Sequence, residues 1–337
     1  MTRTDRSPRA HTLQVPGVRL YYEVRGAGPL LLLLGAPMDA AAFGALADAL
    51  AADRTVVTLD PRGISGSVLD DPRQDSTPDL RADDVTAVLD ALGADRADRA
   101  ARADVFGSSG GAVTGLALIA RHPGRVRTLV AHEPPLLELL PDAAERRAEA
   151  EEVIEVFHRA GAGAAFGRFL AMAGIAGPAD GDGPADGDAP APGNGPADGD
   201  APAGIAGPAP GNGPDIAPGP ESVPGPETGD RPTPQAPAAP PFEPSAQDLA
   251  NSARFFTHEL RDTIAYRPDF PALAAGADRI VVGVGADSRG QLAHRTAVTL
   301  AARLGSTPPT EFPGDHGGFL AHPEEFAARL RAALTAG

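Results

Sequence analysis

Residues 104–120 read DVFGSSGGAVTGLALIA and join a short apolar strand to an amphipathic helix through a turn of glycine and serine. Val105 and Phe106 belong to the strand, and apolar residues recur at helical spacing from Val113 to Ala120. The turn, residues 107–111, matches the pattern G-x-S-x-G in the strand-to-helix context that a nucleophile elbow requires. Its glycines allow the tight bend that exposes the central serine, and the start of the helix supplies amide donors beside it. The pattern therefore predicts Ser109 as a nucleophile.

A glycine-rich turn before a helix can instead cradle a phosphate group, because backbone N–H groups are free at a helix start. The chain contains no G-x-x-x-x-G-K-[ST] motif, and this turn lacks the G-x-G-x-x-G spacing of dinucleotide-binding proteins. The interpretation as a nucleophile is therefore favoured over phosphate binding.

Strand-like and helix-like segments alternate on both sides of this turn. Strands are predicted over residues 18–24, 30–34, 55–59, 126–131 and 279–284, with a further short strand ending near Phe312. Helices are predicted around residues 43–50, 85–92 and 291–304, and from Pro323 onward. Such alternation predicts an α/β fold with a mostly parallel sheet that is covered by helices on both faces.

The middle of the chain, residues 136–270, breaks this alternation with two helical patterns that predict a cap. Between them, residues 174–244 hold 19 of the 36 prolines and repeat the hexapeptide GPADGD three times. Few large apolar side chains occur there, so the segment cannot bury enough surface to offset the entropy cost of ordering it. We therefore expect a disordered insert that divides the cap.

The composition excludes several classes of protein. The insert carries 11 acidic residues and the single Arg231, so it accounts for −10 of the formal charge of −16. The remainder has no basic stripe, which argues against nucleic acid and anionic membranes as partners. The absence of cysteine and lysine excludes disulfides, thiolate zinc sites, a cysteine nucleophile and lysine Schiff bases. The N-terminus lacks an apolar signal segment, so a cytoplasmic location is expected, whereas the oligomeric state is left open.

Among the eight histidines, His316 is best placed to be the base that a serine nucleophile requires. It lies in PGDHGGF, residues 313–319, a loop of small residues after the last predicted strand. His122, His158, His258, His294 and His322 lie on predicted helices or at their ends. We therefore predict His316 as the base.

With a nucleophile followed by a late histidine, the chain resembles the α/β-hydrolase family outside the insert and the first dozen residues. Residues 35–39, GAPMD, resemble the family's oxyanion loop, with Leu34 where many members have histidine, and residues 60–67, DPRGISGS, resemble its D-x-R-G-x-G-x-S loop. The resemblance implies an eight-stranded sheet and an oxyanion hole made by the N–H groups of Gly110 and Ala36, with Met38 as the alternative donor. It divides the chain into a flexible N-terminus (1–11), two core segments (12–135 and 271–337) and the cap (136–270).

The acidic partner of His316 has two candidates. The family usually carries it about three residues beyond a glycine that ends the seventh strand, and counting from Gly285 leads to Ser288, with Asp287 one residue early. A second placement, after the sixth strand, is known in a branch of the haloalkane dehalogenases and corresponds to Glu133. We predict Glu133 as the acid, with Asp287 as the alternative. If Glu133 is not catalytic, it is expected to be a capping carboxylate or to form a salt bridge between cap and core.

A serine at the elbow points to acyl chemistry, in which Ser109 attacks an ester, thioester or related carbonyl of a small-molecule substrate and forms an acyl-enzyme. No cofactor and no metal is needed. The pocket is expected between sheet and cap, where Met38, Phe157, Phe255 and Phe256 are candidate lining residues or, alternatively, part of the cap interior. Two other functions stay open: a cofactor-free haloperoxidase or perhydrolase that uses the same triad, and a non-catalytic protein that binds a small molecule.

Overall fold

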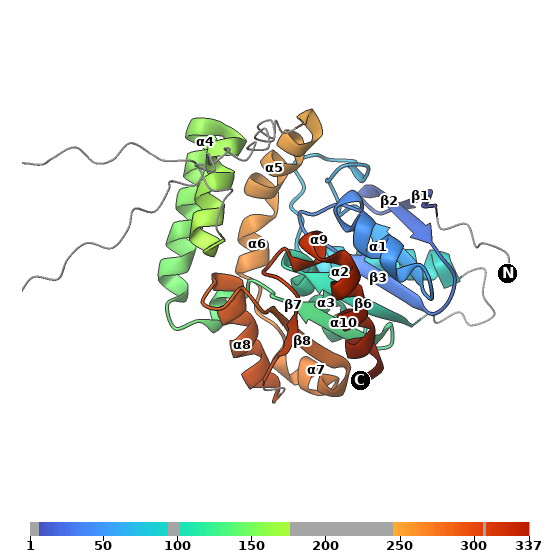
Figure 1. The fold of residues 1–337 in the computed structure, drawn as a ribbon. Helices are drawn as coiled ribbons and strands as arrows, with labels where there is room; N and C mark the ends of the chain where they lie inside the picture. The colour runs from blue at the N-terminus through green and yellow to red at the C-terminus, as the bar shows by residue number, and fades with distance from the viewer. Residues whose placement is uncertain (1–6, 94–101, 176–244, 306–307, 337) are drawn as a thin grey trace, which may run out of the picture. The chain divides into compact units, whose positions relative to one another are not determined.

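The computed structural model describes residues 7–93, 102–175, 245–305 and 308–336. Its single sheet has the strand order β1-β2-β4-β3-β6-β7-β8-β9, with the two-residue β5 paired to β2 (Figure 1). Strands β1 and β2 run antiparallel to their neighbours, and the pairs from β4 to β9 are parallel. The strands are β1 Arg9–Val15, β2 Val18–Arg25, β3 Leu30–Leu34, β4 Thr55–Leu59, β5 Val68–Leu69, β6 Ala103–Ser108, β7 Val126–His132, β8 Ile280–Gly285 and β9 Thr310–Phe312. The predicted mostly parallel sheet is confirmed.

Helices cover both faces of this sheet. The α-helices are α1 Gly44–Leu50, α2 Pro78–Gly93, α3 Gly110–Arg121, α4 Ala143–Ala173, α5 Ala246–His258, α6 Leu260–Ile264, α7 Phe270–Ala274, α8 Leu292–Leu304, α9 Gly318–Ala321 and α10 Pro323–Ala336. Short 3₁₀ turns occur at Ala41–Phe43, Leu137–Leu139 and Ala277–Arg279. Helices α1, α9 and α10 lie on one face, and α2, α3, α7 and α8 lie on the other. Within the described residues, no helix is both long and apolar enough to cross a membrane.

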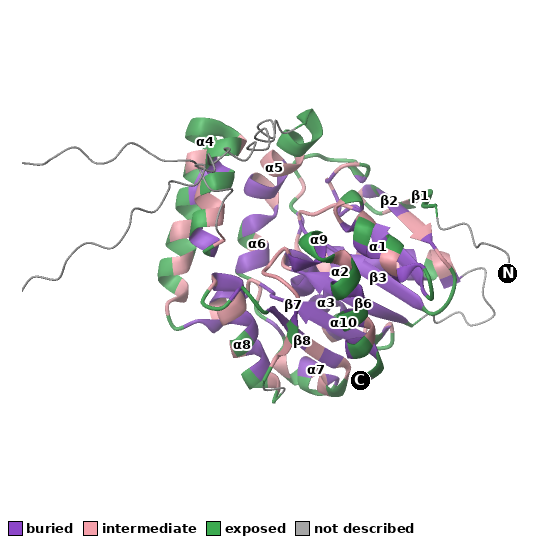
Figure 2. Ribbon diagram, in the orientation of Figure 1, coloured by how far each residue is buried: buried purple, intermediate pink, exposed green. Residues whose placement is uncertain are grey.

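The alternation of side chains along each strand divides the core into two layers. In β3, Leu31 and Leu33 pack with α1 and α10, whereas Leu30, Leu32 and Leu34 pack with α2 and α3. Strand β3 is buried on both faces (Figure 2). A strand in this position is apolar throughout, and β3 has the sequence LLLLL. This rigid double layer fixes the loops that follow the carboxyl ends of the strands.

The cap consists of α4, α5 and α6, whose apolar faces form a third cluster of buried side chains. Helix α4 bends at Gly161, which has a φ of 83°, and ends at Gly174 in the left-handed conformation that glycine adopts at helix ends. Ser245 begins α5 with a capping box, because its hydroxyl accepts from the Asp248 amide and the Asp248 carboxylate accepts in return. Apart from Gly174 and Ile175, the predicted insert 174–244 lies outside the described residues.

The N-terminal boundary requires a correction. Residues 9–11, predicted to belong to a flexible segment, pair with residues 22–24 at the start of β1. This strand is missed because it lies at the sheet edge with most of its side chains exposed, so it shows no apolar alternation. Residues 1–6 lie outside the described part of the chain.

Candidate active site

Ser109 lies between the end of β6 and the start of α3 with φ 54° and ψ −124°, a conformation that is costly for any residue except glycine. The surrounding backbone requires it, since a Cβ on Gly107 would lie 2.5 Å from the Gly111 oxygen. A Cβ on Gly111 would lie 2.0 Å from the Leu34 oxygen. Both glycines therefore allow α3 to start directly against β6 and β3, with Ser109 at the bend.

The loop after β3 lies directly against the start of α3. A Cβ on Gly110 would lie 2.6 Å from the Ala36 oxygen, so only glycine permits this approach. In the described part of the chain, the N–H groups of Ala36, Met38 and Gly110 donate to no acceptor. The two predicted donors, Ala36 and Gly110, are thus neighbours with N–H groups that are free for a ligand oxygen. The Met38 side chain is partly buried against the core layer of α1.

Glu133 and His316 form a hydrogen-bonded pair, with 2.7 Å between Glu133 Oε2 and His316 Nδ1. The other carboxylate oxygen, Oε1, accepts from the Gly285 amide at 2.9 Å and from the Ser288 hydroxyl. Burial alone raises the pKa of Glu133, but the hydrogen bond from His316 and the neighbouring imidazoles lower it to about 2. The carboxylate is therefore ionised at neutral pH, and one of its oxygens is committed to the imidazole.

Asp287, the alternative acid, is exposed, and its backbone amide donates to the Gly314 oxygen at 3.0 Å. Its carboxylate makes no hydrogen bond to a described residue. Ser288, which follows it, is fully buried and donates to Glu133. The loop after β8 therefore supplies a hydroxyl that binds Glu133, and its carboxylate, Asp287, points to no described partner.

Strand register brings the predicted nucleophile and the predicted acid together. Ser108 at the end of β6 is in register with His132 at the end of β7, and the Ser109 amide donates to the His132 oxygen at 3.0 Å. Glu133 is the next residue, and its amide donates to Gly283 of β8. Ser109 Oγ makes no hydrogen bond to His316 or to another described residue, and such bonds are often long in enzymes without substrate.

His132 is a buried residue of the site that the sequence did not single out. It is fully buried among Phe106, Phe312 and Phe326, and its ring lies 6.3 Å from that of His316, centroid to centroid. Its Nδ1 lies 3.3 Å from Ser108 Oγ, and its Nε2 has no partner. Burial lowers the pKa of His132 to about 4, so the ring is neutral at physiological pH. Its position as the last residue of β7 was the only signal in the sequence.

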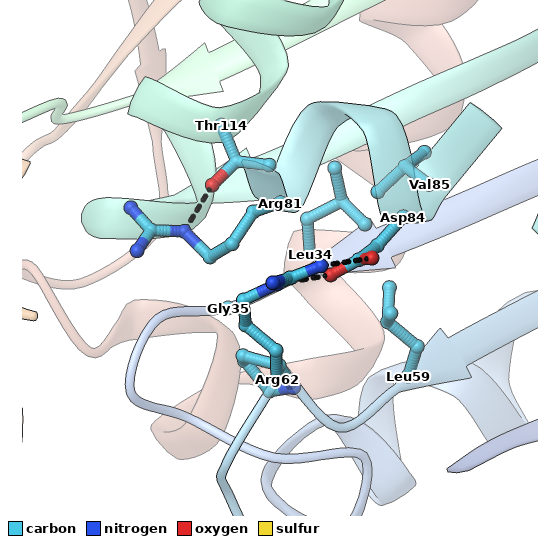
Figure 3. Close-up of a pocket in the computed structure, with 9 residues that line it drawn as sticks. Leu34, Gly35, Leu59, Arg62, Arg81, Asp84, Val85 and Thr114 are labelled. Carbon is cyan, nitrogen blue, oxygen red and sulfur yellow. Dashed lines mark hydrogen bonds and ion pairs between the residues drawn. The ribbon is translucent and has the colours of Figure 1, made fainter. Parts of the chain in front are cut away.

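The predicted pocket residues of the cap lie mostly inside it. Phe255 and Phe256 are buried in the cap cluster, and the half-buried Phe157 packs on Phe256 at 5.7 Å between ring centroids. These contacts agree with the alternative interpretation, packing within the cap. A small cavity lies elsewhere, between the oxyanion loop and helices α2 and α3; residues that line it include Leu34, Gly35, Leu59, Pro61, Arg62, Arg81, Asp84, Val85 and Thr114 (Figure 3).

Comparison with known proteins gives the family. The family model described as alpha/beta hydrolase fold matches residues 28–174. The chain is also 30% identical over 329 residues to an uncharacterized hydrolase, YraK, of Bacillus subtilis, and the match covers 96% of this chain and 95% of that protein. This chain belongs to the α/β-hydrolase family. The predicted resemblance is thus confirmed.

Several solved structures have a fold similar to that of this α/β hydrolase. A thermophilic esterase from Thermogutta terrifontis matches with a TM-score of 0.60 and 16% identity over 98% of both chains. Est816, described as an N-acyl homoserine lactone degrading enzyme, matches with a TM-score of 0.56 and 19% identity over 96% of this chain and 99% of its own. An enol-lactonase from Burkholderia xenovorans matches with a TM-score of 0.52 and 16% identity over 96% and 100%. At these sequence identities, the similarity shows a shared fold only.

Proposed function

We propose that this α/β hydrolase is a serine enzyme that cleaves an ester, thioester or lactone through an acyl-enzyme on Ser109. The observation that carries the proposal is the hydrogen-bonded pair of the buried Glu133 and the half-buried His316, at the carboxyl ends of the strands near the strained Ser109. A serine hydroxyl is a weak nucleophile at neutral pH and needs such a base.

In the first half of the proposed reaction, Ser109 Oγ attacks the substrate carbonyl carbon while His316 takes the hydroxyl proton. The N–H groups of Gly110 and Ala36 hold the negative oxygen of the tetrahedral intermediate. The ionised Glu133 stabilises the imidazolium, which then gives its proton to the leaving alcohol or thiol. In the second half, water loses a proton to His316 and attacks the acyl carbon. The imidazolium then returns that proton to Ser109 Oγ as the carboxylic acid product leaves.

The test is turnover of p-nitrophenyl esters, lactones and thioesters by the purified protein and its variants. Lactones are included because one structural neighbour is described as an N-acyl homoserine lactone degrading enzyme and another as an enol-lactonase. We expect Ser109→Ala and His316→Ala each to lower kcat by at least ~10³-fold. His158→Ala, at an exposed position of α4, is the matched control and should keep full activity.

Covalent labelling gives a second readout. A fluorophosphonate probe should attach to Ser109 in the wild-type chain and leave Ser109→Ala unlabelled. A Ser109→Ala variant that keeps most of its activity would overturn the proposal and make Ser108 the next candidate nucleophile. Failure of every acyl substrate together with absence of labelling would favour a non-catalytic binding protein.

A further inference from the structure

Arg81 of α2 is a buried arginine whose hydrogen bonds join three separate parts of the chain. Its side chain is only 3% exposed. Its Nε donates to Thr114 Oγ1 of α3 at 2.9 Å (Figure 3). Its Nη1 donates to the Ser76 oxygen in the preceding loop. Its Nη2 donates to Thr263 Oγ1 of the cap helix α6 at 3.0 Å. A buried guanidinium with partners on core and cap fixes their relative position at this point.

Toward the proposed catalytic site, Arg81 is linked through Thr114 to the first turn of α3. Arginine can only donate hydrogen bonds, so Thr114 Oγ1 must accept from Arg81, and its own hydrogen is left for another acceptor. That acceptor is the Gly110 oxygen at 3.1 Å. Arg81 therefore orients the hydroxyl that holds Gly110, the residue whose N–H group is the proposed oxyanion donor.

The cavity beside Arg81 places it near the second oxyanion segment as well. Gly35, which precedes Ala36, lines the same cavity as Arg81 and Thr114 (Figure 3). The cavity measures about 10 Å³, which is room for roughly one water molecule. A substrate cannot enter it. The side chains around the cavity therefore pack the oxyanion loop against α3.

On the cap side, Glu259 lies between α5 and α6, is 1% exposed, and has neither carboxylate oxygen in a hydrogen bond with a described residue. Its Oε1 lies 3.5 Å from Arg81 Nη1. Burial raises the pKa of Glu259, and the charge of Arg81 opposes this shift, so the guanidinium is a favourable neighbour of this buried acid of the cap.

From this chain of contacts we propose that Arg81 is a positioning residue, which links the seating of the cap at Glu259 and Thr263 to the oxyanion donor Gly110 through Thr114. The inference rests on the proposed function of Ser109. A cap that shifts on substrate entry would move the guanidinium, and the first turn of α3 would follow. Arg81 itself touches no reacting atom.

The test measures kcat and KM for an ester substrate of the wild type, Arg81→Met, Thr114→Val and Thr263→Val. Removal of an oxyanion donor costs ~10²- to 10³-fold in kcat, so loosening of the donor by Thr114→Val should cost about 10-fold, with KM within about twofold. The affinity for a boronic acid that mimics the tetrahedral intermediate should fall by the same factor as kcat. Active sites are counted by the final extent of fluorophosphonate labelling, so that a smaller folded fraction does not count as slower chemistry.

Arg62→Met is the matched control, since Arg62 is an equally buried arginine on the same cavity wall but pairs with Asp84 of α2. It should lose stability and keep kcat. The effects of Thr114→Val and Thr263→Val on kcat should be non-additive in the double variant, because both act through one guanidinium.

An unchanged kcat and boronate affinity in Thr114→Val would overturn the inference, even where Arg81→Met fails to fold. Additive effects of the two threonine substitutions would overturn the link to the cap. If the wild-type enzyme has no turnover that depends on Ser109, the proposed function itself fails. If such turnover exists and Thr114→Val retains it, only the role of Arg81 is wrong.

Discussion

Replacement of His132 by phenylalanine should make the folded chain less sensitive to acid. In the folded chain His132 is enclosed by aromatic rings, and its pKa is lowered from 6.5 to about 4, mainly by burial; the charge of Glu133 opposes this shift. As the pH falls below 6.5, the unfolded chain takes up a proton at this position before the folded chain does. The folded state therefore loses stability between pH 6.5 and 4.

The size of this loss follows from the two pKa values. The difference in proton uptake amounts to about 2 kcal/mol at pH 5 and approaches about 3 kcal/mol at pH 4. His132→Phe keeps an aromatic ring of similar size among Phe106, Phe312 and Phe326 and removes the titration. Relative to its value at pH 7.5, the stability difference between variant and wild type should change in favour of the variant by about 2 kcal/mol at pH 5.

Urea unfolding at pH 7.5, 6 and 5 measures this change. Unfolding is followed by far-ultraviolet circular dichroism, because the chain has no tryptophan. Among the carboxylates that contribute to the wild-type curve, Glu133 and Asp60 act in opposite directions. The pKa of Glu133 is about 2 in the folded chain, so its stabilisation of the folded state is lost only below pH 4.5. Burial raises the pKa of Asp60 to about 6, so protonation of Asp60 favours the folded state. The comparison with the wild type removes the contribution of Asp60, and pH 7.5 to 5 lies above the range in which Glu133 loses its stabilisation. His158→Phe, at an exposed position, should follow the wild type. A difference between His132→Phe and wild type that is independent of pH would refute the reasoning.

Two further predictions concern the acid and a buried ion pair. Glu133→Gln should lower kcat about 10³- to 10⁴-fold with little change in KM, whereas Asp287→Asn should stay within about twofold; steady-state kinetics with the opposite ranking would return the role of acid to Asp287. Arg62→Met should lower the free energy of unfolding by about 3 kcal/mol, because it leaves Asp84 buried without the guanidinium that donates two hydrogen bonds to it. The double variant with Asp84→Leu should recover most of that loss in urea unfolding, and an equal loss in both variants would contradict this explanation.

The sequence predicted those parts of the fold in which local pattern and tertiary environment agree. Strands β3 and β4 are buried on both faces, and their sequences, LLLLL and TVVTL, consist of apolar or β-branched residues that stand out in the sequence. Strand β1 is half of an exposed edge pair, and β5 has two residues, so neither leaves such a pattern. Ser109 was found because its backbone strain requires glycines at fixed positions nearby.

The remaining features of the site depend on contacts between residues far apart in the chain. Glu133 and Asp287 both lie between Ser109 and His316 in the sequence, and only the pairing of β7 with β8 and the path of the last loop distinguish them. Arg81 and Thr263 are 182 residues apart, so nothing local indicates that they meet. Buried polar residues of this kind are paired by the fold, and their partners cannot be read from spacing.

The position of Glu133 one residue beyond β7 also affects how the gene can change. The proposed nucleophile, both proposed oxyanion donors and the proposed acid are all encoded before the chain enters the cap, and only the proposed base comes after it. Between residue 134 and β8 the chain builds the cap, which must keep the contact of α6 with Arg81, and β8 must return in register beside β7. Both conditions concern residues outside the segment that joins α4 to α5. New codons inserted there lengthen a loop whose closure cost grows slowly with length, and they leave the spacing of Ser109 and Glu133 untouched. The arrangement thus separates the part of the gene that can expand from the part that sets the chemistry.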